Sequence, residues 1–252
     1  GGHIGHVSTA VLLQDVLWFV LNGFVIGGLL HPLMSRIGAG LGAAYGAAAG
    51  TDPAQVLLLA GLPLAAQTVL VLVVADLVEW IVHNLLHRVG VLWRFHRVHH
   101  SIHVMDWIGN FRFHFVEIIV YNTIKYLPLT VLGVSWQATL IAAVFATLIG
   151  HLNHANLDLS WGPLRYVLNS PRMHLWHHDA TPDVPAGYNF AVVFSAWDWM
   201  FGTAHMPRRQ TPERIGFGDD AYFPDALWWR LLVPFASRRQ MQPNARWRGR
   251  IV

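Results

Sequence analysis

Long apolar runs along this chain predict helices that cross a membrane. Residues 10–30 are mostly apolar and long enough to span a bilayer, with Asp15 near their start, and we expect the "HP" at 31–32 to end this helix. Residues 54–75 carry no charge across 22 positions and predict the clearest spanning helix, which we expect Pro63 to kink. The first part of the chain is therefore predicted to supply two membrane helices.

Two later apolar runs predict a helical hairpin that enters the membrane and returns. Residues 115–132 and 136–150 are each short for a full span, and Pro128 and the "LG" at 132–133 predict a break between them. Residues 38–50 are rich in glycine and alanine, and the pattern leaves open whether they form a close-packed helix or a loop.

The runs together predict the fold class. After residue 155 the chain becomes rich in Trp, Pro and Arg, so only short helices are expected there. No low-complexity linker divides the chain, and residues 1–252 are expected to form a single membrane domain. We expect an all-α, integral membrane bundle of about four spanning or re-entrant helices, with a histidine-rich helical cap on the cytosolic side.

Composition supports a membrane environment. Hydrophobic residues make up 54% of the chain and charged residues only 12%, whereas a soluble domain carries roughly 25% charged residues. The chain contains no cysteine, which excludes disulfides, zinc–thiolate sites, iron–sulfur clusters and thiol catalysis. Any metal must therefore be held by His, Asp or Glu.

Basic residues are concentrated near the C-terminus. Arginines of this region include Arg208, Arg209, Arg238, Arg239, Arg246, Arg248 and Arg250. Such a cluster can bind nucleic acid or anionic lipid, or it can mark the cytoplasmic side of a membrane protein. We favour a cytoplasmic tail, because the rest of the chain is apolar, and we expect no nucleic-acid partner.

Histidines gather in four clusters with the spacing of one helix face. Their members are His83 and His87, then His96, His99 and His100, then His151 and His154, and finally His174, His177 and His178. One such pair is commonly surface decoration, but ten of the sixteen histidines lie in these clusters. Ten imidazoles exceed the roughly four to six ligands of one ion and suit two, with Fe, Zn, Cu or Ni favoured over Ca or Mg.

Three of the clusters resemble the histidine boxes of the fatty acid hydroxylase/sterol desaturase superfamily. Residues 83–87, 96–100 and 174–178 read HNLLH, HRVHH and HLWHH, and the boxes of this superfamily read HxxxH, HxxHH and HxxHH. The surrounding words "WRFHRVHHS", "NSPRMHLWHH" and "YNFAVVFSAWDWMFGT" agree. The resemblance covers residues 76–203, roughly half of the chain, as a histidine-box catalytic region.

The resemblance implies the metal ligands position by position. They are His83, His87, His96, His99, His100, His151, His154, His174, His177 and His178. Whether His151 is a ligand stays open at this point. His114 lies in a word common in the family and could be a ligand, a group behind the ligands or a residue on the substrate side. His3, His6, His31, His103 and His205 are expected not to be ligands.

Several polar residues could lie behind the ligands, because a metal-bound imidazole usually donates its other N–H to a carboxylate or carbonyl. Asp76 and Glu79 precede His83 by seven and four residues and share its helix face. Glu79 could equally be a charge that meets water at the membrane surface. Asn189 and Asp198 lie in a family-like word, and Asp179 and Glu117 could serve similarly.

The resemblance also implies an activity. Members of this superfamily are integral membrane di-iron oxygenases, so we expect two iron ions, which zinc could replace in a purified sample, with O2 as co-substrate. No catalytic residue is expected beyond the metal ligands. We favour hydroxylation of an unactivated C–H bond in a lipid or sterol-like substrate, with desaturation on the same site as the alternative.

Two further expectations concern partners and location. We expect electrons from a separate donor of the ferredoxin or cytochrome/reductase type, and we expect the bacterial inner membrane, with the histidine cap and the C-terminus cytoplasmic. A histidine-rich metal transporter is the alternative from another class. It would place ligands along the spanning segments, whereas most of these histidines flank them.

Overall fold

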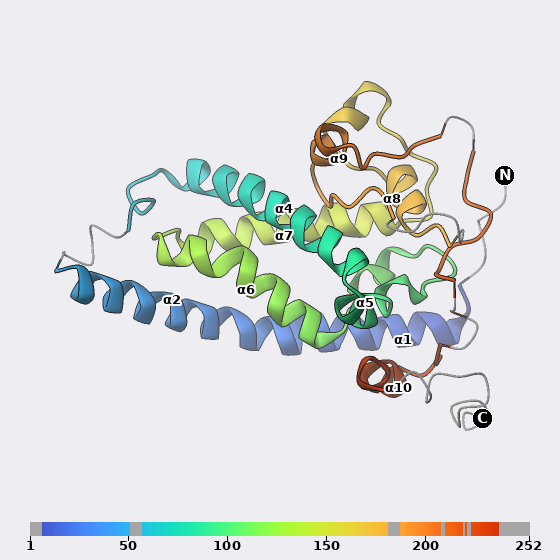
Figure 1. Ribbon diagram of the computed structural model, residues 1–252, viewed down its shortest axis with the longest axis horizontal. Coiled ribbons are helices and arrows are strands. Elements are labelled where there is room, and N and C mark those ends of the chain that lie inside the picture. The colour runs from blue at the N-terminus through green and yellow to red at the C-terminus, as the bar shows by residue number, and fades with distance from the viewer. Residues whose placement is uncertain are drawn as a thin grey trace.

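The structure is a computed structural model that describes residues 7–50, 57–180, 187–207, 210–218, 220 and 223–236. Within these ranges the chain is helical and forms no strand, apart from one isolated bridge between Asp179 and Ile215. A long helical rod runs beside three shorter helices, and a compact cap covers one end of the bundle (Figure 1). We call the opposite end the narrow end.

The rod is one continuous helix of 41 residues, Thr9–Ala49. It consists of α1 (Thr9–Phe19), a π-helical stretch η1 (Val20–Ile26) and α2 (Gly27–Ala49). At about 1.5 Å per residue it is about 60 Å long, roughly twice the thickness of a bilayer core. The expectation that "HP" ends this helix is wrong, since Pro32 lies inside α2. Proline is tolerated in membrane helices because neighbouring groups compensate for the lost hydrogen bond.

The next membrane helix begins later than the apolar run suggested. Helix α4 (Leu64–Arg88) starts directly after Pro63, which is its N-cap residue and does not kink it. Residues 58–62 form a turn instead of helix, and the first residues of the predicted span lie outside the described ranges. Proline suits a helix start because its missing N–H would have no partner there. The helix carries His83 and His87 in its last two turns, as predicted.

The predicted hairpin is present. Helix α6 (Phe115–Val131) and helix α7 (Trp136–His154) are joined by the short turn 132–135. At the narrow end, the Gln67 side chain accepts a hydrogen bond from the backbone N–H of Ser135 (2.7 Å) and donates one to the carbonyl of Leu62 (2.9 Å). This amide therefore ties α4 to the hairpin turn and satisfies polar backbone groups that lipid could not.

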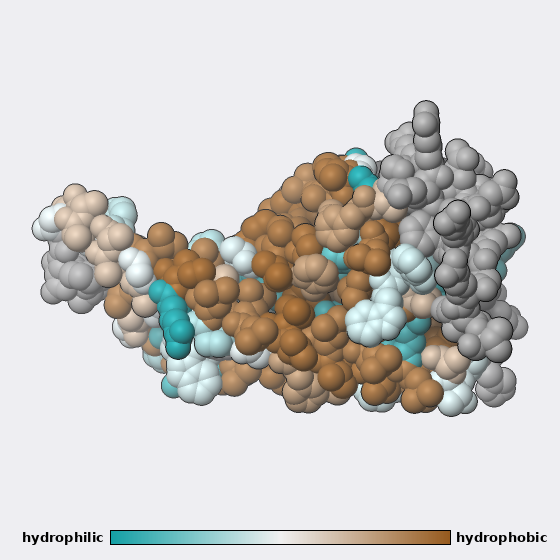
Figure 2. Space-filling view, turned by 90° about the horizontal axis from the view of Figure 1, so that it is seen from below, coloured by the Kyte–Doolittle hydropathy of each residue, from teal (hydrophilic) through white to brown (hydrophobic). Residues whose placement is uncertain are grey.

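The bundle packs through small and apolar side chains and turns other apolar residues outward. Its core includes Val71 and Ala75 of α4, and Ala138 and Ala142 of α7. The outer face in Figure 2 is mostly apolar between the narrow end and the cap. Among the described residues, three helices are long and apolar enough to cross a membrane, namely Thr9–Ala49, Leu64–Arg88 and Trp136–His154. The prediction of an all-α membrane bundle with a histidine-rich helical region is confirmed.

Short helices build the cap. They are α5 (Gly90–His96), η2 (His99–Ser101), η3 (Trp107–Phe111), η4 (Gly162–Tyr166), α8 (Pro171–His177), α9 (Ala196–Phe201), α10 (Leu227–Leu232) and η6 (Val233–Phe235). The cap is not polar all round. Trp228 is 74% exposed on α10 and Met200 is 68% exposed on α9. Exposed apolar side chains of this size suit contact with an apolar phase.

Gly38 allows α2 to approach α6 closely, and this contact gives a test of the packing. A Cβ atom at Gly38 would lie 2.6 Å from Cγ2 of Thr130, whereas a Cβ at Gly40 would meet nothing within 4 Å. We expect Gly38→Ala to destabilise the protein by about 1–3 kcal/mol through overpacking. The control Gly40→Ala should be neutral or stabilising by up to about 1 kcal/mol. Thermal unfolding in detergent micelles measures both, and equal stabilities would contradict this packing.

Candidate metal centre

Four helices end at the same point in the cap and carry the clustered histidines in their last turns. Helix α4 carries His83 and His87, and α5 carries His96. Helix α7 carries His154, and α8 carries His174 and His177. The carbonyl end of a helix carries partial negative charge. The convergence of four such ends therefore favours a cation between them.

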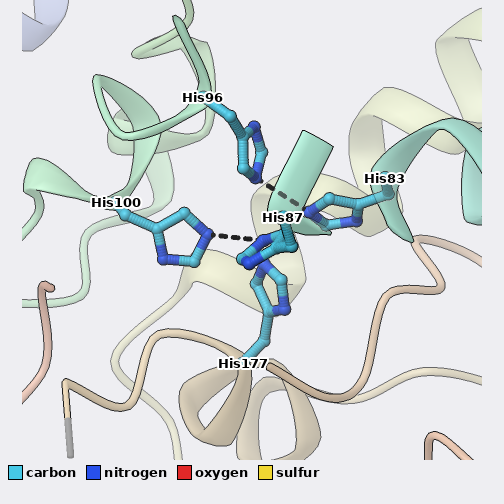
Figure 3. Close-up of side chains that lie close together, drawn as sticks. All are labelled: His83, His87, His96, His100 and His177. Atoms are coloured by element: carbon cyan, nitrogen blue, oxygen red, sulfur yellow. Dashed lines mark hydrogen bonds between the residues drawn. The ribbon is translucent and has the colours of Figure 1, made fainter. Parts of the chain in front are cut away.

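Five histidines form the first group: His83, His87, His96, His100 and His177. One ring nitrogen of each lies within 4.8 Å of those of the others. Figure 3 shows the five rings pointing toward one another, two from α4 and one each from α5, η2 and α8. Nε2 of His83 lies 3.0 Å from Nε2 of His96, and Nε2 of His87 lies 3.1 Å from Nε2 of His100.

Four further histidines form the second group: His99, His154, His174 and His178. All four are buried. Nε2 of His154 lies 3.2 Å from Nε2 of His99 and 3.1 Å from Nε2 of His174, which is 3.2 Å from Nε2 of His178. The Phe113 ring stacks on His99, with the ring centroids 4.2 Å apart. The second group is thus held in one arrangement by packing.

Hydrogen bonds at Nδ1 fix which nitrogen of several rings is bare. Nδ1 of His83 donates to the carbonyl of Phe190 (2.7 Å) and Nδ1 of His177 to the carbonyl of Tyr188 (2.8 Å). Nδ1 of His96 donates to the Glu117 carboxylate (2.7 Å). A neutral imidazole has one proton, so Nε2 of each of these rings carries a lone pair directed into the group.

Bare nitrogens at this distance fit a metal ion. With the Glu117 carboxylate ionised, Nδ1 of both rings donates, and His83 and His96 point unprotonated Nε2 atoms at each other at 3.0 Å. Nε2 of His177 is buried with no hydrogen-bond partner. A cation between the lone pairs removes the repulsion and satisfies the orphaned nitrogen. All-imidazole donor sets suit Fe, Zn, Cu or Ni, and the N–H bonds to carbonyl and carboxylate groups are those of metal-bound histidines.

Burial keeps the imidazoles of the cap neutral. The grouped histidines outside the spanning helices are His96, His99, His100, His174, His177 and His178. Burial is the largest cause that lowers the pKa of each of them well below 6.5, and repulsion from neighbouring histidines adds to it. Neutral imidazole is the form that binds metal.

The structure brings nine of the ten predicted ligands together and leaves His151 outside both groups. Nδ1 of His151 donates to the carbonyl of Trp107 (2.6 Å), and its ring lies against Phe111. His114 also lies elsewhere. Its Nδ1 accepts from the N–H of Val116 and caps α6, while its Nε2 donates to the carbonyl of Leu231.

Asp76 and Asp198 were expected to accept a hydrogen bond from a ligand histidine, but both carboxylates contact other groups. Asp76 accepts from the N–H groups of Val193 and Phe194 and from the indole of Trp197. Asp198 accepts from the N–H groups of Phe190 and Ala191. The two carboxylates thus hold residues 190–198 against α4, and this same segment presents the carbonyl that orients His83.

Glu79 and Asn189 also contact other groups. Glu79 pairs with Lys125 of α6 (2.9 Å), inside the bundle. The Asn189 side chain donates to the carbonyls of Met173 and His205 and supports its own left-handed backbone. The carboxylate that does contact a grouped histidine is Glu117. Its signal in the sequence was a charge at the start of an apolar run, where ionisable residues are commonly functional.

Comparison with known families agrees with this geometry. The profile of the fatty acid hydroxylase family matches residues 68–203, more than half of the chain. The chain belongs to the fatty acid hydroxylase family. The resemblance drawn from the histidine boxes is thereby confirmed. The matched region contains every grouped histidine and Glu117, while α1 and α10 lie outside it.

The curated relatives of this chain are named for reactions on different substrates. The ornithine lipid hydroxylase of Rhizobium tropici is 35% identical over 154 residues, which cover 61% of this chain and 46% of that protein. The alkylglycerol monooxygenase of Caenorhabditis elegans is 26% identical over 146 residues, covering 56% and 27%. Cholesterol 25-hydroxylase-like protein 2 of Danio rerio is 32% identical over 145 residues, covering 54% and 48%. The chain spans at most about half the length of these relatives, and no solved structure matches it.

The lowered pKa values predict acid sensitivity of the metal-free protein. The cap histidines resist protonation when folded, whereas in the unfolded chain they take up protons below about pH 6.5. Their contribution to stability is therefore fully present above pH 6.5 and is lost as the pH falls toward the lower folded pKa values. We expect the unfolding temperature of chelator-treated protein to fall steadily between pH 7 and pH 5. A constant value over this range would contradict burial of neutral histidines.

Proposed function

We propose that this protein is a membrane oxygenase that uses two iron ions, O2 and external electrons to hydroxylate an unactivated C–H bond of a lipid. The observation that carries the proposal is the pair of buried, all-histidine groups at one end of a membrane bundle, five residues in one and four in the other. Family membership supports it, since the names of several relatives denote lipid hydroxylases and monooxygenases.

The ligands in this proposal are the nine grouped histidines. The five of the first group, with His96 held by Glu117, would bind one ion, and the four of the second group the other. The ions supply the activation of O2. The protein orients the imidazoles, keeps them neutral and excludes water from the centre by burial. The catalytic region is residues 76–203 within a single membrane domain, residues 1–252.

The overall reaction sets what must be delivered to the site. One atom of O2 enters the lipid as a hydroxyl group and the other leaves as water, which requires two electrons and two protons per turnover. The chain contains no cysteine and so cannot hold an iron–sulfur cluster. We therefore propose that the electrons come from a donor outside residues 1–252, of the ferredoxin or cytochrome/reductase type.

The rival role of metal transporter is disfavoured by the placement of the groups. A transport path needs ligands at successive depths of the bilayer. All nine grouped histidines meet where four helices end, and the core of the bundle toward the narrow end is apolar. Residues this buried and mutually fixed suit a resident metal centre better than a moving ion.

The first prediction from this function concerns the product. We expect cells that express the wild type under 18O2 to form a lipid that carries one additional 18O atom, and His177→Ala to abolish it, because Nε2 of His177 points into the first group. His151→Ala is the matched control, because His151 lies outside both groups, and it should retain product and metal. Lipid mass spectrometry and metal analysis of the purified proteins give the two readouts.

Each outcome of that experiment is informative. A product that lacks two hydrogen atoms and carries no label would make the protein a desaturase. Loss of both metal and product in His151→Ala would make His151 a further ligand. Unchanged product and metal content in His177→Ala would overturn the metal-centre assignment.

The second prediction concerns sidedness. The segments 57–63 and 132–135 at the narrow end contain no Lys or Arg, whereas Arg88, Arg94 and Arg97 lie at the cap end. From the positive-inside rule we propose that the cap lies in the cytoplasm, at the inner membrane if the host is bacterial. Because the chain has no cysteine, each introduced one is unique. We expect an impermeant thiol reagent to label Glu213→Cys only in inverted vesicles and Leu58→Cys only in right-side-out vesicles. The reverse pattern would place the cap outside.

A further inference from the structure

The two histidine groups share one short turn. His99 belongs to the second group, and the next residue, His100, belongs to the first. Both lie in η2, a single turn of three residues. A displacement of η2 therefore moves one ligand of each group at once, so the spacing between the groups depends on how this turn is held.

A buried ion pair from the N-terminal rod holds the end of η2. Nη1 of Arg112 donates to the carbonyl of Ser101, the last residue of the turn (3.0 Å). The remaining donors of the guanidinium, Nε and Nη2, bind the carboxylate of Asp15 on α1 at 2.6–2.8 Å. Asp15 is 1% exposed and Arg112 is 3% exposed. The carboxylate fixes the plane of the guanidinium and so aims Nη1 at the turn.

A second polar contact joins the rod, at η1, to the segment that packs on His99. Nδ2 of Asn22 donates to the carbonyls of Phe111 and Phe113, both at 2.8 Å. The ring of Phe113 lies parallel to that of His99, with an interplanar angle of 6°. Asn22 lies in the π-helical stretch of the rod, and departures of this kind from α-helix are frequent at functional sites.

Stability alone does not explain such polar contacts in a membrane helix. Buried ion pairs are commonly no more stabilising than apolar residues of the same size, and their best-supported use is to select one geometry. Here both polar contacts end on the segment that carries or packs on His99 and His100. Asp15 and Asn22 also lie outside residues 68–203, the part of the chain that matches the family.

We propose that Asp15 and Asn22 are positioning residues of the metal centre, which act through Arg112 and Phe113 to fix the η2 turn and thereby the spacing between the two metal ions. This inference rests on the proposed function, because it requires an ion in each group. It gives the N-terminal rod a part in the chemistry besides anchorage in the membrane.

The test compares Asp15→Asn and Asn22→Leu with Gln67→Leu in the full chain. Gln67 is the matched control, because it is also a buried side chain with hydrogen bonds between helices, but at the narrow end. The unfolding temperature is measured without metal. Iron is then titrated into each protein, and X-ray absorption and the magnetic coupling of the loaded protein report the metal–metal distance.

We expect Asp15→Asn and Asn22→Leu to bind the second iron ion about 10- to 100-fold more weakly than the wild type and to change the metal–metal distance. Gln67→Leu should lose thermal stability but keep two ions at the wild-type distance. Wild-type affinity and distance in both rod variants would overturn the positioning role. A wild type that binds fewer than two ions would instead overturn the proposed function, so the two failures are distinguishable.

Discussion

Repulsion among nine imidazoles is the constraint on which the cap depends. The rings lie too close together to carry charge, and Nε2 atoms of neighbouring rings approach one another to about 3 Å. Cations between the lone pairs would relieve this repulsion, and the surrounding chain holds several of the rings from behind. The carbonyls of Tyr188 and Phe190 and the carboxylate of Glu117 do so directly. Asp76 and Asp198 in turn hold residues 190–198 against α4.

The bundle follows from the solvent in which it folds. Lipid offers no hydrogen bonds, so each buried polar group of the spanning helices needs a partner within the protein. Lys125 pairs with Glu79, and Gln67 satisfies backbone groups at the narrow end. For the same reason Asp15 pairs with the guanidinium of Arg112, the residue that follows η3. These polar side chains of the membrane region therefore fix how two elements meet.

Sequence patterns predicted what depends on local chemistry. Histidine spacing identified nine residues that the structure gathers, since each cluster lies on one helix and needs only that helix to form. The predictions made from proline were wrong at two helices. Helix propensities measured in water overstate how strongly Pro32 breaks a helix in lipid. Pro63 starts α4, because proline can begin a helix as well as bend one. The division of His99 and His100 between two groups, the placement of Glu117 behind His96, and the exclusion of His151 depend on contacts between distant segments. Spacing along the chain carries no information about those contacts.

The apolar patches of the cap have a consequence for kinetics. Trp228 of α10 and Met200 of α9 expose large apolar side chains on the same part of the molecule that holds the histidines. Under the proposed function, such a cap would rest at the membrane surface, and its lipid would reach the metal centre by lateral diffusion without crossing water. The quantity that governs saturation is then the mole fraction of the lipid within the bilayer. Diluting the substrate with inert phospholipid slows such an enzyme even when the bulk concentration of substrate is unchanged.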